Sequence, residues 1–365
     1  MTDSSEQTYH FQHLGLNDEV ISAFETAEQG IEGAYLARIV RLDRGLPLAT
    51  SEHETCRVQS ANHLLKAAKR NAQARPAIGD WVVLTHPDGH EMPVIEGILP
   101  RTSAFIRKDP AEAASEQVVI ANVDVVFILH ALTGGGINVG RLDRELVIAY
   151  ESGARPVIVL TKADLIDDKT FIEEQRALAQ AQGAGARVIV ESAQTGEGVD
   201  DIRAYVSEGV TAAMIGASGV GKSTLTNALV GKEAQEIGDV REGDDKGRHT
   251  TVARSMVEMP QGGILIDTPG MRAIAPWHAE RGLALAFPEI AEASQYCKFA
   301  DCTHNGEPGC AVIAAEDITE DRLSRYCALR EELKDLQQST REQAWARGEG
   351  KSHSFIKHSK KPFKK

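Results

Sequence analysis

One segment of the chain has a residue pattern suited to binding phosphate groups. Residues 216–223 read GASGVGKS; they follow an apolar run (TAAMI) and lead into a run typical of a helix (STLTNALV) that begins at Ser223. Glycines let backbone N–H groups surround a phosphate, and the amino terminus of a helix adds positive potential. Motif and context together predict a nucleotide-binding P-loop rather than a ligand-free glycine turn. Its predicted ligand-binding residues are Gly216, Ala217, Ser218, Gly219, Val220, Gly221, Lys222, Ser223 and Thr224.

Two side chains of this loop have separate chemical tasks. Lys222 supplies a mobile positive charge for the β- and γ-phosphates, and the hydroxyl of Ser223 has the right length to reach Mg²⁺. A P-loop does not by itself select the base of the nucleotide.

A second motif favours guanine. Thr161, Lys162, Ala163 and Asp164 follow an apolar run (PVIVL), and nucleotides bind where the parallel strands of such folds end. The Asp164 carboxylate can accept hydrogen bonds from N1–H and the exocyclic amine of guanine, whereas adenine presents an acceptor and a bare carbon there. The Lys162 stem can lie along the base plane. The motif therefore predicts GTP binding and disfavours an ATP-dependent kinase.

Further residues are spaced to complete such a site. Ser192 and Ala193 follow another apolar run (ARVIVE), where a backbone N–H would lie near guanine O6, although Ser-Ala alone is also compatible with an ordinary turn. The run GGILI is followed by DTPG, in which Asp267 would hold Mg²⁺ through water. The backbone N–H of Gly270 would meet the γ-phosphate.

The residues expected to govern hydrolysis depart from a common GTPase pattern. The glycine that ends DTPG is often followed by a glutamine that orients the attacking water, but here the next residue is Met271. A thioether cannot position water in this way, so we expect slow turnover by the isolated chain. His249 is the nearest candidate for a catalytic group, and a solvated loop histidine is the alternative. Either Thr250 or Thr251 would contact Mg²⁺.

Four residues near the carboxyl-terminal end have the spacing of a metal site. Three cysteines and one histidine form C-x₄-C-x-H-x₅-C, with two glycines that allow the loop to turn. Three thiolates and an imidazole suit tetrahedral Zn²⁺, and a set of four protein ligands predicts one closed, structural site. The alternative is a set of scattered buried cysteines. The predicted ligands are Cys297, Cys302, His304 and Cys310.

The distribution of apolar and polar residues along the 365 residues predicts several domains, which contain these motifs. Short β-rich runs come first, then apolar β-branched runs that alternate with helical stretches, which is typical of a parallel sheet covered on both faces. The fold class is thus multidomain, with an α/β P-loop domain at its centre. The predicted divisions are a partly disordered leader (1–32), an all-β domain (33–110), a nucleotide domain (117–275), a mainly helical metal-binding domain (276–345) and a basic tail (346–365).

Hydropathy and charge limit the kinds of partner that the chain is expected to contact. The sequence has no apolar run of the ~18 residues that span a membrane and no secretory signal, so we expect a cytoplasmic protein without membrane contact. Net charge is −13, yet the last fifteen residues contain six lysines and no acid. Such a tail suits contact with phosphate backbones, and a solubilising tail is the alternative. Lys66, Lys69, Arg70 and Arg75 form another basic cluster, equally compatible with a solvated face.

The order of the motifs along the chain resembles that of a known protein family. GTPases ordinarily begin with the P-loop and end with the base-reading motifs, whereas TKAD and Ser-Ala precede GASGVGKST and DTPG here. With the β-rich start and the cysteine–histidine cluster, the chain closely resembles the circularly permuted, ribosome small-subunit-dependent GTPases (RsgA, also called YjeQ). The resemblance implies an OB-fold RNA-binding domain, a zinc domain, and GTP hydrolysis to GDP that the small subunit stimulates during its late maturation. It also implies that Met271 and His249 match the hydrophobic residue and the switch histidine of the family.

Two hypotheses about function follow. The first is a GTPase that binds GTP with Mg²⁺, contacts the small ribosomal subunit and its rRNA, and acts as a monomer. The second is an RNA-binding assembly module that uses GTP as a ligand switch with negligible turnover, which Met271 keeps open.

Overall fold

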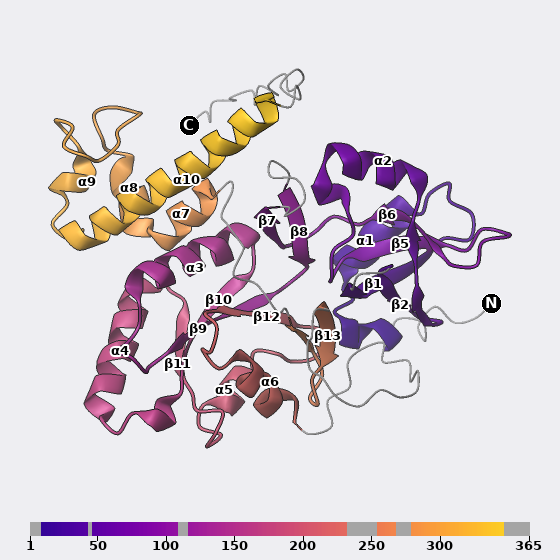
Figure 1. Cartoon of the computed structure of the whole chain (residues 1–365), viewed down its shortest axis with the longest axis horizontal. Coiled ribbons are helices and arrows are strands. Elements are labelled where there is room, and N and C mark those ends of the chain that lie inside the picture. Colours follow the sequence, from indigo (N-terminus) through magenta and orange to yellow (C-terminus); the bar gives the residue numbers. More distant parts are fainter. Residues whose placement is uncertain (1–8, 43–45, 109–115, 232–253, 268–278, 347–365) are drawn as a thin grey trace, which may run out of the picture.

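The computed structural model describes residues 9–42, 46–108, 116–231, 254–267 and 279–346 (Figure 1). Three groups of elements follow one another along the chain: a β-rich group, a sheet flanked by helices, and a helical group. None of the helices within these ranges is long and apolar enough to cross a membrane.

The sheet of the second group holds the nucleotide motifs. Its strands are β9 (Val125–Ala131), β10 (Arg155–Thr161), β11 (Arg187–Val190), β12 (Thr211–Gly216), β13 (Arg254–Glu258) and β14 (Ile264–Asp267). The order is β11-β10-β9-β12-β14-β13, and neighbours are parallel except for β13, which runs antiparallel to β14. Although β9, β10 and β11 come first in the chain, β12 lies between β9 and β14. This arrangement is the permuted P-loop fold that the motif order predicts.

Helices cover both faces of this sheet because its strands are apolar on both sides. The helices are α3 (Val139–Ser152), α4 (Lys169–Gln182), α5 (Val199–Arg203) and α6 (Lys222–Val230). The first two pack on the face that includes Ile128, and the other two pack on the face that includes Phe127. Side-chain oxygens of Asn138 and Asp168 cap the amino termini of α3 and α4.

The β-rich group contains β1 (Tyr35–Leu42), β2 (Leu48–Ser51), β3 (Thr55–Arg57), β4 (Gln59–Ser60), β5 (Trp81–Thr85), β6 (Val94–Ile98) and α2 (Asn62–Arg70). Its pairing order is β3-β2-β1-β5-β6-β4. Among the described residues no pairing closes β3 onto β4, so an OB barrel stays a prediction. Strand β1 also pairs with β13, with Arg41 opposite Ser255, which joins both groups in one twelve-stranded sheet.

The apolar run VVIANVDVVFILHAL forms two strands with different partners. Its first part lies in β8 (Glu116–Ala121), which pairs with β7 (Ala104–Lys108) in a separate two-stranded sheet. At Asn122 the backbone takes a positive φ of 55°, and the chain then enters β9. Only the second part therefore belongs to the parallel sheet.

Arg38 of β1 joins the amino-terminal segment to the two sheet regions. Its guanidinium is 1% exposed. It donates hydrogen bonds to the carbonyl oxygens of Gly79 and Asn122 (3.2 and 3.1 Å), to the Thr211 hydroxyl (3.0 Å) and to the Leu14 carbonyl oxygen. Leu14 ends the short helix η1 (Tyr9–Leu14), which α1 (Asp18–Ala27) follows. A buried guanidinium that donates four hydrogen bonds to different segments fixes the relative positions of those segments.

The helical group comprises α7 (Glu280–Ala286), α8 (Pro288–Ser294), α9 (Ala311–Ala314) and α10 (Glu320–Ala346). It docks on α3 through ion pairs from Arg322 and Arg325 to the buried carboxylate of Asp143, at 2.8 and 2.7 Å. Leu329 and Leu333 of α10, which lie on the same face of the helix, are buried.

Candidate functional site

The predicted P-loop connects the end of β12 to the start of α6. Gly216 has a φ of 146°, and a Cβ there would lie 2.7 Å from the Leu129 carbonyl oxygen, so only glycine fits. Gly221, with a φ of 115°, is the residue before α6. The loop therefore presents its backbone at the amino terminus of a helix, where an anion is stabilised.

Lys222 extends across this loop. Its Nζ donates hydrogen bonds to the carbonyl oxygens of Gly216 and Ala217, both at 2.8 Å. Ser223 and Thr224, in the first turn of α6, are exposed. The Lys222 ammonium and the hydroxyls of Ser223 and Thr224 thus lie at the same end of the sheet as the loop backbone.

The structure brings the predicted base-reading motif, residues 161–164, directly against the predicted P-loop. The Lys162 ammonium donates to the Gly219 carbonyl oxygen (2.6 Å), and the Thr161 hydroxyl donates to the Val220 carbonyl oxygen (2.6 Å). Lys162 has a left-handed φ of 62°, which turns the chain sharply after β10. Two motifs almost sixty residues apart therefore form one continuous surface.

Asp164 has one carboxylate oxygen fixed by a neighbouring strand. The buried Ser192 hydroxyl donates to Asp164 Oδ1 at 2.7 Å, while the Asp164 side chain remains exposed. The Ala163 N–H donates to the Glu191 carbonyl oxygen (3.1 Å), which holds the two segments together. One oxygen of Asp164 is thus oriented by the protein, and the other remains available to a ligand.

Sequence reasoning missed Glu191, the residue before Ser192. Its side chain is 2% exposed, and Oε2 has no hydrogen-bond partner. The pKa of this carboxyl is raised to about 7, chiefly by burial; the Ala193 N–H opposes the shift, and the nearby Asp164 charge adds to it. The sequence does show an acidic residue between a predicted strand and the Ser-Ala motif. It does not show that this residue is buried, so Glu191 could not be identified from the sequence.

The residues predicted to act on magnesium and water are only partly described. The backbone of Asp267 ends β14, beside β12 in the sheet. Its side chain, Gly270 and Met271 lie outside the described parts, as do His249, Thr250 and Thr251. Among the predicted magnesium ligands, Ser223 is the one whose side chain belongs to the described parts of the chain.

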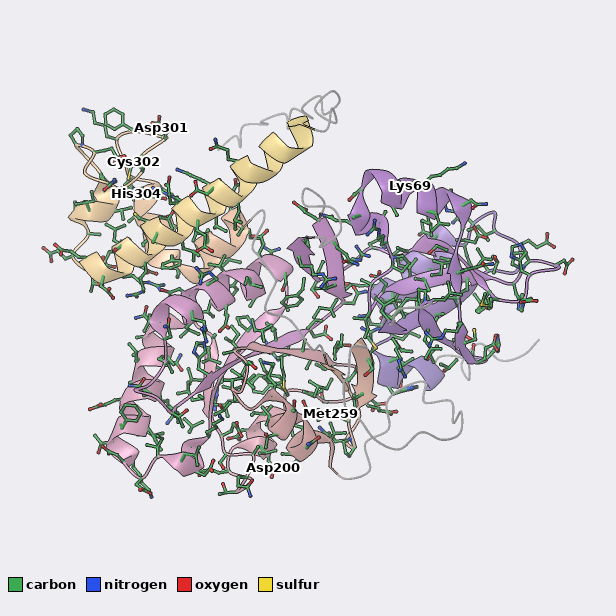
Figure 2. All side chains as sticks on the ribbon, in the orientation of Figure 1. Lys69, Asp200, Met259, Asp301, Cys302 and His304 are labelled. Atoms are coloured by element: carbon green, nitrogen blue, oxygen red, sulfur yellow. The ribbon has the colours of Figure 1, made fainter. Side chains whose placement is uncertain are left out.

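The four predicted metal ligands converge. Their ligand atoms all lie within 4.8 Å of one another, and Figure 2 shows Cys302 and His304 on loops at the end of the helical group. Cys297 Sγ lies 3.9 Å from Cys310 Sγ, and His304 Nδ1 lies 3.4 Å from Cys310 Sγ. A tetrahedral zinc ion with Zn–S bonds of about 2.3 Å separates two sulfur ligands by about 3.8 Å. The donor set and its spacing therefore fit one zinc ion.

Three residues of the metal-binding loop have a left-handed backbone conformation with positive φ. His304 has a φ of 59°, and Gly306 and Gly309 have φ values of 97° and 80°. Cys310 is buried and His304 is 6% exposed, so part of the site is shielded from water. No side chain beyond the four belongs to the cluster among the described residues, which suits a structural site.

Removing zinc should unfold the metal loop selectively. With a chelator, we expect amide exchange within 297–310 to accelerate at least about a hundredfold, because structural zinc contributes well over ~3 kcal/mol to local folding. Exchange in β10 and β12 should change little, since both strands are hydrogen-bonded within the parallel sheet and one face of each packs in a core that contains none of the ligands. Cys302→Ser should reproduce the effect without chelator, and Cys56→Ser, far from the cluster, is the control. Unchanged protection of 297–310 after chelation would contradict structural zinc.

Comparisons with known proteins agree with this arrangement. A model of the RsgA GTPase family matches residues 98–277, and one described as 50S ribosome-binding GTPase matches residues 211–344. The chain is 38% identical over 342 residues to a protein of Streptomyces coelicolor named small ribosomal subunit biogenesis GTPase RsgA, covering 91% of this chain and 89% of the relative. A protein of the same name from Methanosarcina acetivorans is 39% identical over 340 residues, with 90% and 89% covered.

Two solved structures are similar over most of their length. YjeQ from Thermotoga maritima aligns with a TM-score of 0.61 and 26% identity, covering 82% of this chain and 99% of YjeQ. YloQ, described as a circularly permuted GTPase, aligns with a TM-score of 0.60 and 25% identity, covering 84% and 97%.

Proposed function

The chain belongs to the RsgA GTPase family, and from this premise we propose that it hydrolyses GTP during late maturation of the small ribosomal subunit. Its relatives carry small-subunit biogenesis in their names. We infer that it acts as a monomer in the cytoplasm, in contact with the subunit and its rRNA.

One observation carries the assignment of the nucleotide site: the direct contact of Lys162 with Gly219 in the P-loop. Because base and triphosphate are ends of one molecule, the motifs that bind them must lie side by side. In the proposed site, Asp164 accepts hydrogen bonds from guanine, and the P-loop amides with Lys222 hold the phosphates. Bound Mg²⁺ would neutralise phosphate charge, with Ser223, Asp267 and one of Thr250 and Thr251 as its protein contacts.

Contact with rRNA is proposed for the β-rich group. Lys66 and Lys69 on α2 are exposed, and Figure 2 shows Lys69 pointing away from the body of the molecule. Strands of this group would supply the binding face if they form an OB fold. The lysine-rich tail would add further phosphate contacts.

We propose that the small subunit supplies or orders the group that isolated chains lack for hydrolysis. Met271 cannot orient water, and His249 is the candidate that the subunit would order. Purified small subunits should raise GTP turnover by at least about tenfold, since groups supplied in trans accelerate phosphoryl transfer by ~10³ or more in other GTPases.

Phosphate release with and without purified small subunits measures this effect. Large subunits at equal concentration are the matched control, and they should leave turnover at its basal rate. No acceleration by small subunits, with GTP still bound, would favour a nucleotide switch with negligible turnover instead.

A further inference from the structure

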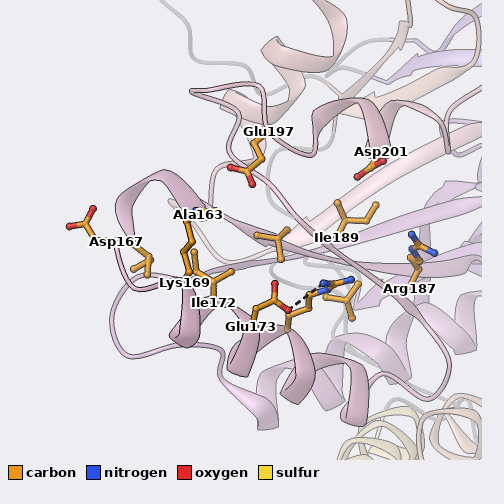
Figure 3. A pocket seen from close by; sticks show the side chains of 13 residues that line it. Ala163, Asp167, Lys169, Ile172, Glu173, Arg187, Ile189, Glu197 and Asp201 are labelled. Carbon is orange, nitrogen blue, oxygen red and sulfur yellow. Dashed lines mark hydrogen bonds and ion pairs between the residues drawn. The ribbon is translucent and has the colours of Figure 1, made fainter.

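A groove runs along the outer edge of the parallel sheet and reaches the loop after β10, where Ala163 of the predicted guanine motif is one of its lining residues. Strand β11 is the last strand in the sheet order, so its outer side has no neighbouring strand among the described residues. Beside it lies a cavity of about 670 Å³, lined by the whole of β11 and by residues from the α4 side and the α5 side (Figure 3). An edge strand with accessible backbone is a template for pairing with another extended chain.

The two walls of the groove differ in chemistry. On the α4 side, Ile166, Ile172 and Val190 pack partly against the core and leave apolar surface facing the cavity. On the opposite side, Glu197 and Asp201 contribute carboxylates, and Figure 3 shows both across the groove from α4. Successive side chains of a strand point to opposite faces, so a strand added here would place alternate residues against each wall.

Among the described residues, some acidic side chains of the groove have an ion-pair partner and others have none. On the α4 side Glu173 pairs with Arg176 at 3.4 Å. Within the described parts of the chain, neither Glu197 nor Asp201 has an ion-pair partner for its carboxylate. The remaining charged residues are Asp167 and Lys169 at one end of the groove and Arg187 towards the other end in Figure 3. One wall therefore presents uncompensated negative charge, which repels a phosphate backbone and attracts Lys or Arg.

We propose that this groove binds an extended segment of a partner protein, which adds as a strand beside β11. Its apolar side chains face Ile166 and Ile172, and the alternate Lys or Arg side chains face Glu197 and Asp201. Main-chain hydrogen bonds to β11 supply affinity, and the two walls supply specificity. The groove adjoins the nucleotide site at Ala163 and shares no residue with the metal site, and its assignment does not depend on the proposed function.

A blocked heptapeptide of alternating valine and lysine is a direct probe. We expect it to bind the full chain in a fluorescence anisotropy titration. Combined Glu197→Lys and Asp201→Lys changes should weaken binding at least about tenfold, because each replaces attraction by like-charge repulsion. Asp200→Lys is the matched control: it lies beside Asp201, is 90% exposed and does not line the groove, so affinity should be retained.

A second peptide tests the strand pairing itself. The same heptapeptide with every backbone nitrogen methylated cannot donate a main-chain hydrogen bond to β11 in either strand direction, and we expect its binding to be lost. Equal binding of both peptides, or unchanged affinity after the double charge reversal, would overturn the proposal. Much tighter peptide binding by a chain ending at residue 346 would also overturn it, since the occupant would then be the chain's own tail.

Discussion

We expect the Lys222→Ala variant to lose GTP turnover by about a thousandfold or more. Lys222 places its ammonium within the P-loop, 2.8 Å from the carbonyl oxygens of Gly216 and Ala217. During hydrolysis negative charge shifts onto the oxygens near this position, and removal of one preorganised donor commonly costs ~10²–10³ in rate. A full positive charge has a larger effect than a neutral donor, and nucleotide affinity should fall as well.

Phosphate release in the presence of small subunits and binding of a fluorescent GTP analogue measure the two losses separately. The variant should remain folded, because Gly216 ends β12, Ala217 follows it, and both residues are only partly buried, so their carbonyl oxygens can bond to water. Lys169→Ala, an exposed lysine of the same sheet region, is the control and should retain turnover. Full turnover by Lys222→Ala, with unchanged analogue affinity, would remove the P-loop assignment.

The convergence of the nucleotide motifs was predictable because it follows from one geometric rule. Parallel strands covered by helices end at the same edge, so the residues after β10, β11 and β12 must meet there. The contacts of Lys162 with Gly219 and of Ser192 with Asp164 are the result. The metal ligands were predictable for a different reason: all four lie within fourteen residues, and glycine turns leave such a short loop few ways to fold around an ion.

The connections between the groups could not be predicted, because they depend on partners distant in sequence. Nothing local to Arg38 indicates that its guanidinium is buried among carbonyl oxygens from three other segments. In the same way, neither β1 nor β13 carries a signal for pairing with the other. The raised pKa of Glu191 also arises from burial by other elements. Sequence patterns report a residue's own neighbourhood, whereas these features are set by the packing of whole groups.

Asp164→Asn should reverse the base preference of the site from GTP towards xanthosine triphosphate. We expect GTP affinity to fall about a hundredfold or more, because an amide N–H that faces the donors of guanine leaves polar groups on both sides unpaired in the complex. Guanine presents donors at N1 and at the exocyclic amine, and xanthine replaces that amine by a carbonyl oxygen. Titration of each nucleotide by calorimetry measures the change. Asp167→Asn, three residues further along, is the control and should keep the preference for GTP.

The hydroxyl of Ser192 makes this prediction sharper. It donates to Asp164 Oδ1 at 2.7 Å, so in the Asp164→Asn variant the amide should keep its oxygen towards Ser192 and direct its NH₂ group towards the base. That group opposes the donors of guanine but can donate to the added carbonyl oxygen of xanthine. Adding Ser192→Ala frees the amide to rotate, so the double variant should discriminate between the two nucleotides less than Asp164→Asn alone. If Asp164→Asn kept the original preference, the base would have to be recognised by a different group, and the motif after β10 would lose its assigned role.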